Sequence, residues 1–296
     1  MAFSMHSHSG QFCPGHAQDT LEAVIQTAIA RGMHTFALTE HMPRNSEADL
    51  YPEEISAGDK IDHHHTNHHA YIAEAVRLRS KYAEEITILI GFEGEWIRGD
   101  YGPLVLQLAA DPAVDFFIGS VHHVHGHPID YNVALYAKAV AASGGTEEGC
   151  YEAYFDAQFE MLNVLKPRVV GHFDLIRLLA TQKDKQLDSM PGIWEKVLRN
   201  LRVVVEQGGL LEVNSAGLRK GLKEPYPGRA VCEAFMGDGG TFHADHGVAQ
   251  VGTNYGRAVA YLEGLGVEEV WTLGKAEGGL VVKSVSLADV KATFKE

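Results

Sequence analysis

Cysteine pairs, basic clusters and long apolar runs are all missing from this chain of 296 residues. Its three cysteines have no paired spacing, which disfavours a disulfide framework and fits a reducing compartment. The formal net charge of −14 and the lack of a Lys/Arg cluster disfavour a nucleic-acid surface, because such surfaces neutralise phosphates. No stretch resembles a signal peptide or reaches membrane-spanning length. We therefore expect a cytoplasmic protein that binds neither nucleic acid nor membrane.

A linker rich in proline or serine is also absent, as are internal repeats. The hydrophobic content of 45% is ordinary for a chain with a substantial core. Barrels of alternating strands and helices commonly reach this length as one domain. The sequence therefore predicts a single domain over residues 1–296.

Strand and helix signals alternate along the chain. Apolar runs predict strands over residues 35–38, 86–90, 114–118, 169–170, 210–213 and 267–273. The clearest helix is expected over residues 19–31, with Asp19 and Glu22 as a capping box and Gly32 at its end. Six or seven such units favour an α/β barrel, although periodicity alone leaves a doubly wound sheet open.

Side chains that could bind metal follow most of these runs. Eight histidines and carboxylates have this position: His6, His8, His41, Glu93, His122, His172, Asp245 and His246. A β/α barrel gathers the carboxyl ends of its strands on one face, so residues far apart in sequence can meet there. The layout therefore predicts a metalloenzyme.

The local patterns suggest how some of these residues act. In extended backbone, His6 and His8 point to the same side and can bind one ion from two imidazoles. Glu93 and Glu95 also share a side, and one of them could bridge two cations. We take His41 as a ligand and Glu40 as a partner that orients an imidazole.

Other candidates keep two interpretations. His16, in the loop before the first helix, is either a ligand or a surface histidine, and the nearby Cys13 is expected to be a small apolar filler. Arg219 either clamps a phosphate or is an ordinary surface arginine. The histidine-rich run over residues 62–69 is expected to be the solvated start of a helix or to bind metal adventitiously, because it does not follow a strand.

Taken in order, the motifs resemble one known family. They read HSHSGQFCPGHA, TEHMPR, GFEGEWIR, GSVHHVHG, GHFDLIR, EVNSAGLRKG and DHGVAQVGTNY. This series is similar to the histidinol-phosphate phosphatase branch of the PHP (polymerase and histidinol phosphatase) superfamily. The resemblance implies one PHP metallophosphatase domain over residues 1–296, with a distorted (β/α)7 TIM-like barrel. It also implies hydrolysis of L-histidinol phosphate to L-histidinol and phosphate, in a monomer or a homodimer.

The resemblance further implies a trinuclear site of zinc, manganese or iron. One ion would be held by His6, His8, Glu93 and Asp245, the second by Glu93, His122 and His172, and the third by His16, His41 and His246. The implied phosphate-binding residues are Arg219, Arg177 and His123, and the implied catalytic residues are Glu93, Asp245 and His246. In this family a hydroxide that bridges two ions attacks phosphorus.

The last motif departs from the family pattern, which is usually Ser-Asp-x-His. Here Asp245 directly precedes His246, and adjacent strand residues point in opposite directions. Either a bulge brings both to the cluster, or His243 substitutes as a ligand, or the first ion binds weakly. Three alternatives stay open: an amidohydrolase, a non-catalytic metal-binding or storage homologue, and a PHP nuclease, which the acidic charge disfavours.

Overall fold

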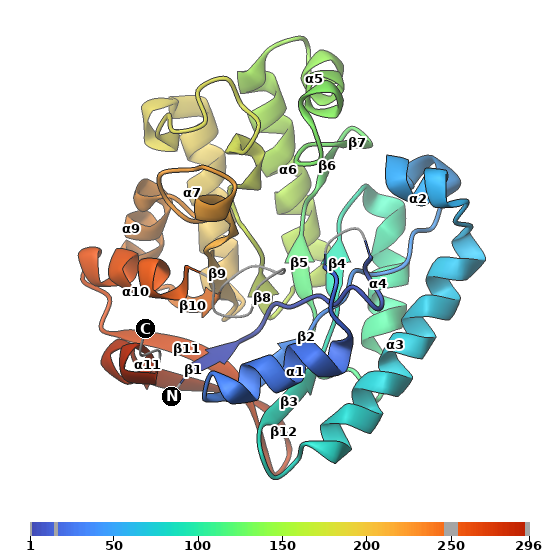
Figure 1. Ribbon diagram of the computed structural model, residues 1–296. Helices are drawn as coiled ribbons and strands as arrows, with labels where there is room; N and C mark the ends of the chain where they lie inside the picture. Colours follow the sequence, from blue (N-terminus) through green and yellow to red (C-terminus); the bar gives the residue numbers. More distant parts are fainter. Residues whose placement is uncertain (1, 15–16, 246–253, 294–296) are drawn as a thin grey trace.

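Parallel strands alternate with helices, and the helices lie around the strands (Figure 1). The computed structural model describes residues 2–14, 17–245 and 254–293. Within these ranges no helix is both long and apolar enough to cross a membrane. The predicted α/β class is confirmed.

A three-stranded parallel sheet forms the first part of the fold, in the order β1-β2-β3. Its strands are β1 (Ala2–Ser4), β2 (Met33–Leu38) and β3 (Thr87–Ile90). The connections between them contain α1 (Leu21–Ala30), the short helices η1 (Glu47–Asp49) and α2 (Pro52–Ala57), and the long helix α3 (Ile61–Lys81).

A five-stranded parallel sheet follows, in the order β10-β9-β8-β5-β4. Its strands are β4 (Glu93–Glu95), β5 (Ile118–Ser120), β8 (Val169–Val170), β9 (Leu210–Asn214) and β10 (Thr241–Asp245). The intervening helices include α4 (Gly102–Ala109), α5 (Val133–Ala142), α6 (Glu147–Leu165), α7 (Pro191–Glu206), α8 (Ala216–Arg219) and α9 (Arg229–Gly237).

Short elements complete the described chain. They are η2 (Gly99–Tyr101), the hairpin β6 (His123–Val124) and β7 (His127–Pro128), η3 (Leu175–Arg177), η4 (Leu187–Ser189), α10 (Tyr255–Gly264), β11 (Glu269–Ala276), β12 (Gly279–Ser286) and α11 (Leu287–Thr293). The predicted strand over 267–273 corresponds to β11. It pairs antiparallel with β12 and therefore does not add a further parallel strand.

The two parallel sheets meet at the carboxyl ends of β2 and β3. His41 forms an isolated parallel bridge with Glu93, and the Glu93 amide donates to the Glu40 carbonyl at 2.9 Å. The Tyr71 hydroxyl lies 2.7 Å from both the Leu38 and the Gly91 carbonyl oxygens, and it ties the same junction to α3. Parallel strand pairing among the described residues gives these two sheets and does not close into a ring.

The N-cap of the first helix lies one residue after the position that the sequence pattern predicted. The expected capping box of Asp19 and Glu22 is wrong, because Thr20 caps α1 and its hydroxyl accepts from the Ala23 amide at 3.2 Å. Gly32 follows the helix with φ +73°, a conformation that favours glycine, as the sequence predicted.

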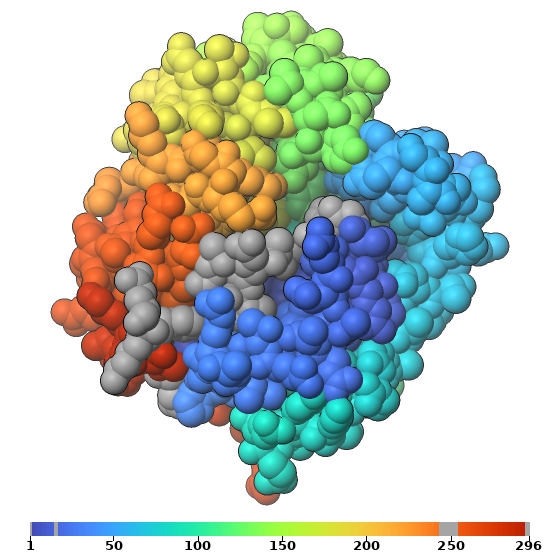
Figure 2. Space-filling model, viewed as in Figure 1, coloured from blue at the N-terminus to red at the C-terminus, as the bar shows by residue number. Residues whose placement is uncertain are grey.

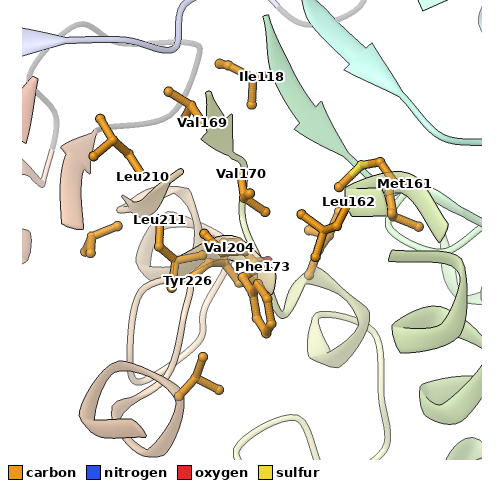
Figure 3. Close-up of a cluster of buried hydrophobic side chains, with 14 of the residues drawn as sticks. Ile118, Met161, Leu162, Val169, Val170, Phe173, Val204, Leu210, Leu211 and Tyr226 are labelled. Carbon is orange, nitrogen blue, oxygen red and sulfur yellow. The ribbon is translucent and has the colours of Figure 1, made fainter. Parts of the chain in front are cut away.

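The hydrophobic core lies between the strands and the helices that cover them. In the five-stranded sheet, residues of β5, β8 and β9 pack with side chains from α6, α7, the segment after β8 and the segment between α8 and α9. Figure 3 shows Ile118, Met161, Leu162, Val169, Val170, Phe173, Val204, Leu210, Leu211 and Tyr226 of this cluster. A second cluster joins α1 and α3 to the three-stranded sheet. These two cores fix the strands whose carboxyl ends form the candidate site.

Candidate metal centre

Six of the predicted ligands meet at the carboxyl ends of five parallel strands. They are His6 and His8 after β1, His41 after β2, Glu93 after β3 where it begins β4, His122 after β5 and His172 after β8. All but His41 are less than 10% exposed. On the face shown in Figure 2, the dark-blue N-terminal segment borders the lighter-blue α2–α3 region. The six side chains therefore gather at strand ends, as the sequence predicted.

One oxygen of the Glu93 carboxylate faces three imidazoles. Glu93 Oε2 lies 3.3 Å from His6 Nε2, 3.2 Å from His8 Nε2 and 3.1 Å from His41 Nδ1. Burial by itself would raise the pKa of Glu93, but the charges of the surrounding histidines hold it well below its usual range. The carboxylate therefore stays ionised.

The other oxygen of Glu93 faces a second group. Glu93 Oε1 lies 2.9 Å from His172 Nε2 and 3.3 Å from His122 Nε2, and it accepts a hydrogen bond from the Ser120 hydroxyl at 2.7 Å. A Cβ atom at Gly171 would come within 2.8 Å of the Ser120 hydroxyl oxygen. Glycine at position 171 therefore permits the close approach of the backbone to Ser120.

The donor set suits a divalent cation. The Nε2 atoms of His6 and His8 lie 3.1 Å apart, and those of His122 and His172 lie 3.2 Å apart. Two neutral imidazoles cannot both direct a lone pair at each other favourably, whereas an ion shared by both nitrogens satisfies them. With Glu93, each pair forms a group whose ligand atoms all lie within 4.8 Å of one another. Glu93 is common to both groups, which is the arrangement of a bridging carboxylate.

A third group contains a residue that the sequence analysis set aside. Potential ligand atoms of His8, Cys13 and His41 lie within 4.8 Å of one another. Burial raises the pKa of the Cys13 thiol well above its usual range, so Cys13 is protonated without a bound cation. Its distance to His8 and His41 places Cys13 at the edge of the cluster.

Further carboxylates lie behind the histidines. Glu95 pairs with the Arg44 guanidinium and with His123 Nδ1, and its Oε1 is 3.6 Å from His122 Nδ1. Of the two glutamates expected at this strand end, Glu93 lies among the ligand histidines. Glu95 lies outside them and contacts His122 and His123. Sequence reasoning missed Arg44, although it stands in the TEHMPR motif three residues after His41.

Glu40 has the supporting position that the sequence predicted. Its Oε2 is 3.7 Å from His8 Nδ1, and its Oε1 accepts from the Ser9 amide at 2.8 Å and the Ser9 hydroxyl at 2.6 Å. Sequence reasoning missed Glu212, whose Oε1 contacts His6 Nδ1 at 2.7 Å. The signal available for it was a single charge inside an apolar strand run.

The last motif is described only in part. His16 and His246 lie outside the described residues. Strand β10 pairs in parallel with β9, and this register places His243 beside Glu212 and Asp245 beside Asn214. The backbone of β10 therefore reaches the same strand end as Glu212, a residue already in contact with the cluster.

The two candidate phosphate-binding arginines lie in different environments. Arg219 ends α8 and is exposed. Arg177 is buried, where its Nε lies 2.7 Å from Asp174 Oδ2 and its Nη2 donates to the Pro225 carbonyl at 2.5 Å. Of the two, Arg219 is therefore the side chain open to solvent, whereas Arg177 is already held by Asp174 and Pro225.

A cavity of about 670 Å³ opens beside the cluster. Glu40, His41 and Arg44 form one side, and α2 and α3 contribute Glu54, His64, His68 and other side chains. The histidine run was expected to be a solvated helix start, and His63 and His69 are exposed as predicted. His68 differs: it is 6% exposed and packs near the rings of Tyr71 and Phe92.

The burial of His68 predicts a pH-dependent stability. Burial, aided by the charge of His69, lowers the pKa of His68 from 6.5 to about 4. Between these values the unfolded chain binds the proton and the folded chain does not, so stability is lost as pH falls from about 6.5 towards 4. Replacing His68 with Phe should reduce the loss in unfolding free energy between pH 7.5 and pH 5 by on the order of 2 kcal/mol.

Urea unfolding of the metal-free protein at the two pH values measures this difference. His63→Phe is the matched control, because that ring is exposed on the same helix and does not contribute to the pKa shift of His68. An unchanged pH dependence in the His68 variant would show that folding does not lower the pKa of His68, and would contradict the prediction.

The fold and the site together define a class, that of metal-dependent α/β hydrolases. The model of the PHP domain matches residues 4–216. A probable histidinol-phosphatase of Schizosaccharomyces pombe is 40% identical over 99% of this chain and 97% of its own length. The histidinol-phosphatase of Saccharomyces cerevisiae is 32% identical over 88% of this chain and 87% of its own length. The chain belongs to the histidinol-phosphatase family of the PHP superfamily, which confirms the resemblance seen in its motifs.

A solved structure shares the fold. Histidinol phosphate phosphatase of Lactococcus lactis subsp. lactis, in complex with zinc, L-histidinol and phosphate, superposes with a TM-score of 0.65. The match covers 92% of this chain and 97% of that one, at 17% identity. The similarity therefore extends over nearly the whole α/β fold.

Proposed function

We propose that this protein hydrolyses L-histidinol phosphate to L-histidinol and phosphate with divalent metal ions as cofactors. The observation that carries the proposal is the meeting of five imidazoles on the two oxygens of the buried Glu93 carboxylate. Its relatives in S. pombe and S. cerevisiae bear the name histidinol-phosphatase, and the L. lactis structure holds zinc, L-histidinol and phosphate. The chemistry of the donor set and the family agree.

The proposed site is trinuclear and lies at the end of a distorted (β/α)7 barrel. We assign His6, His8, Glu93 and Asp245 to one ion, and Glu93, His122 and His172 to the second. His41 would hold the third with His16 and His246. Bound zinc, manganese or iron would activate a water at neutral pH and stabilise negative charge on the phosphoryl oxygens.

The protein's own residues would orient the reaction. Glu93 would keep the two ligand groups a fixed distance apart, and Ser120 would hold the Glu93 carboxylate in place through its hydrogen bond. We propose Arg219 as the main phosphate-binding side chain, since it is exposed near the carboxyl end of β9. For Arg177 and His123, phosphate binding would require sharing their contacts with Asp174 and Glu95.

The cavity beside His41 is proposed to receive the organic part of the substrate. Its volume of about 670 Å³ falls in the range of small-molecule sites. Four carboxylates line it, Glu40, Glu53, Glu54 and Asp59, and they suit a substrate that carries an amine. We propose no nucleic-acid partner and a monomeric or homodimeric state.

Phosphate release from L-histidinol phosphate tests this function. We expect zinc- or manganese-loaded protein to release phosphate, chelation to abolish release, and added metal to restore it. Glucose 6-phosphate, which lacks the amine and the imidazole, serves as the control and should be a poor substrate. If the loaded protein hydrolyses neither compound, a non-catalytic metal-binding homologue becomes the better account.

A further inference from the structure

Glu212 is a fully buried carboxylate at the centre of β9. Its Oε1 contacts His6 Nδ1 at 2.7 Å and accepts from the Asn214 amide side chain at 3.0 Å. Its Oε2 accepts from the backbone amide of His172 at 2.7 Å. Both oxygens of one side chain are therefore engaged by residues that carry candidate metal ligands.

The two contacts reach different ligand groups. His6 belongs to the group with His8 and Glu93, whereas His172 belongs to the group with His122 and Glu93. A carboxylate at Nδ1 of an imidazole fixes the tautomer that leaves Nε2 free to bind metal. His6 directs that Nε2 at Glu93 Oε2, 3.3 Å away. Glu212 thus sets the orientation of His6 from behind.

The contact with His172 acts on the backbone. His172 has a φ of +21°, in a region that residues other than glycine rarely adopt. Such a conformation persists only where surrounding contacts hold it, and the hydrogen bond to Glu212 Oε2 is one of them. From this backbone His172 reaches Glu93 Oε1 at 2.9 Å.

Other carboxylates near the cluster have less direct roles. Glu95 lies 3.6 Å from His122 Nδ1 and is held by Arg44, and Glu40 lies 3.7 Å from His8 Nδ1 and is held by Ser9. Glu212 differs from them, because it contacts two candidate ligand residues, His6 and His172, at 2.7 Å each. It therefore links both ligand groups as Glu93 does, but from the outside.

We infer that Glu212 is a positioning residue that fixes the ligand geometry of both metal groups, and so sets the affinity of the site for metal. The inference rests on the proposed metal centre. A glutamine at this position has one accepting oxygen and one donating amide group. Whichever way the amide turns, it presents a donor to either His6 Nδ1 or the His172 amide, and one ligand loses its acceptor.

Zinc affinity measures this directly. We expect Glu212→Gln to bind zinc about 10–100-fold more weakly than the unsubstituted chain in a competition titration with a chromophoric chelator. The matched control is Asp49→Asn, which also neutralises a buried carboxylate. Asp49 binds Arg98 and Tyr101 and has no described contact with the cluster. This control should retain the zinc affinity even where its melting temperature falls.

Equal zinc affinity in Glu212→Gln and the unsubstituted chain would overturn the inference, as would an equal loss in the Asp49 variant. Should Glu212→Gln fail to fold, Glu212→Asp serves instead, because it keeps the charge on a shorter side chain. We expect a smaller loss of zinc affinity in this variant. Unchanged zinc affinity would contradict the inference. Zinc binding is measured without substrate, so this outcome is independent of phosphate release. Absent phosphate release with the expected affinity loss would reject the proposed reaction and leave the role of Glu212 standing.

Discussion

Replacing Glu93 with Gln should lower phosphate release from L-histidinol phosphate by on the order of 1,000-fold or more, the scale on which single preorganised catalytic groups act. The two oxygens of Glu93 face imidazoles of separate ligand groups, Oε2 towards His8 and Oε1 towards His172. An amide keeps the shape but removes the negative charge and turns a donor towards one group. Two metal groups would then lose their shared ligand at once.

Steady-state kinetics at saturating zinc measure this loss, together with the zinc content of the purified variant. Glu148→Gln provides the matched control, because Glu148 is an exposed glutamate of α6 remote from the cluster. The control should keep the turnover of the unsubstituted chain. Full turnover in the Glu93 variant would show that Glu93 is not a shared metal ligand needed for the reaction.

The second large effect is expected at His122. Its Nε2 lies 3.2 Å from His172 Nε2 and 3.3 Å from Glu93 Oε1, and alanine there removes a nitrogen from the second ligand group. Changing a group that only orients a ligand already lowers affinity or activity about 10–100-fold. We therefore expect His122→Ala to lose more than about 100-fold in turnover.

Phosphate release by His122→Ala is compared with that by His34→Ala. His34 is exposed in the first half of β2, well before the carboxyl end where the cluster forms. The control separates the loss of a histidine as such from the loss of this ligand position. Turnover of His122→Ala equal to that of the control would break the assignment of the second ligand group.

The site could be located from the sequence because its side chains lie at the ends of predicted strands. His41, Glu93 and His172 each follow or end an apolar run, and parallel strands must bring their carboxyl ends together. That argument needs only the alternation of strands and helices. It could not tell which oxygen of Glu93 faces which histidine, since that depends on the relative heights of the strands.

The supporting residues were harder to find. Glu212 is one charge in an apolar strand, and Arg44 is one arginine in a polar loop. Their roles arise from contacts across long sequence separations, such as that of Glu212 with His6. Similarly, the antiparallel partner of β11 could not be read from its apolar pattern, because both sheet types accept such a run.

Anomalous scattering from crystals of the metal-loaded protein, recorded on both sides of the zinc edge, tests directly whether Glu93 is shared by two metal ions. We expect strong peaks on both sides of Glu93, one within bonding distance of His6 and His8 and another within bonding distance of His122 and His172. A zinc peak elsewhere, with Glu93 bound to no ion, would contradict it.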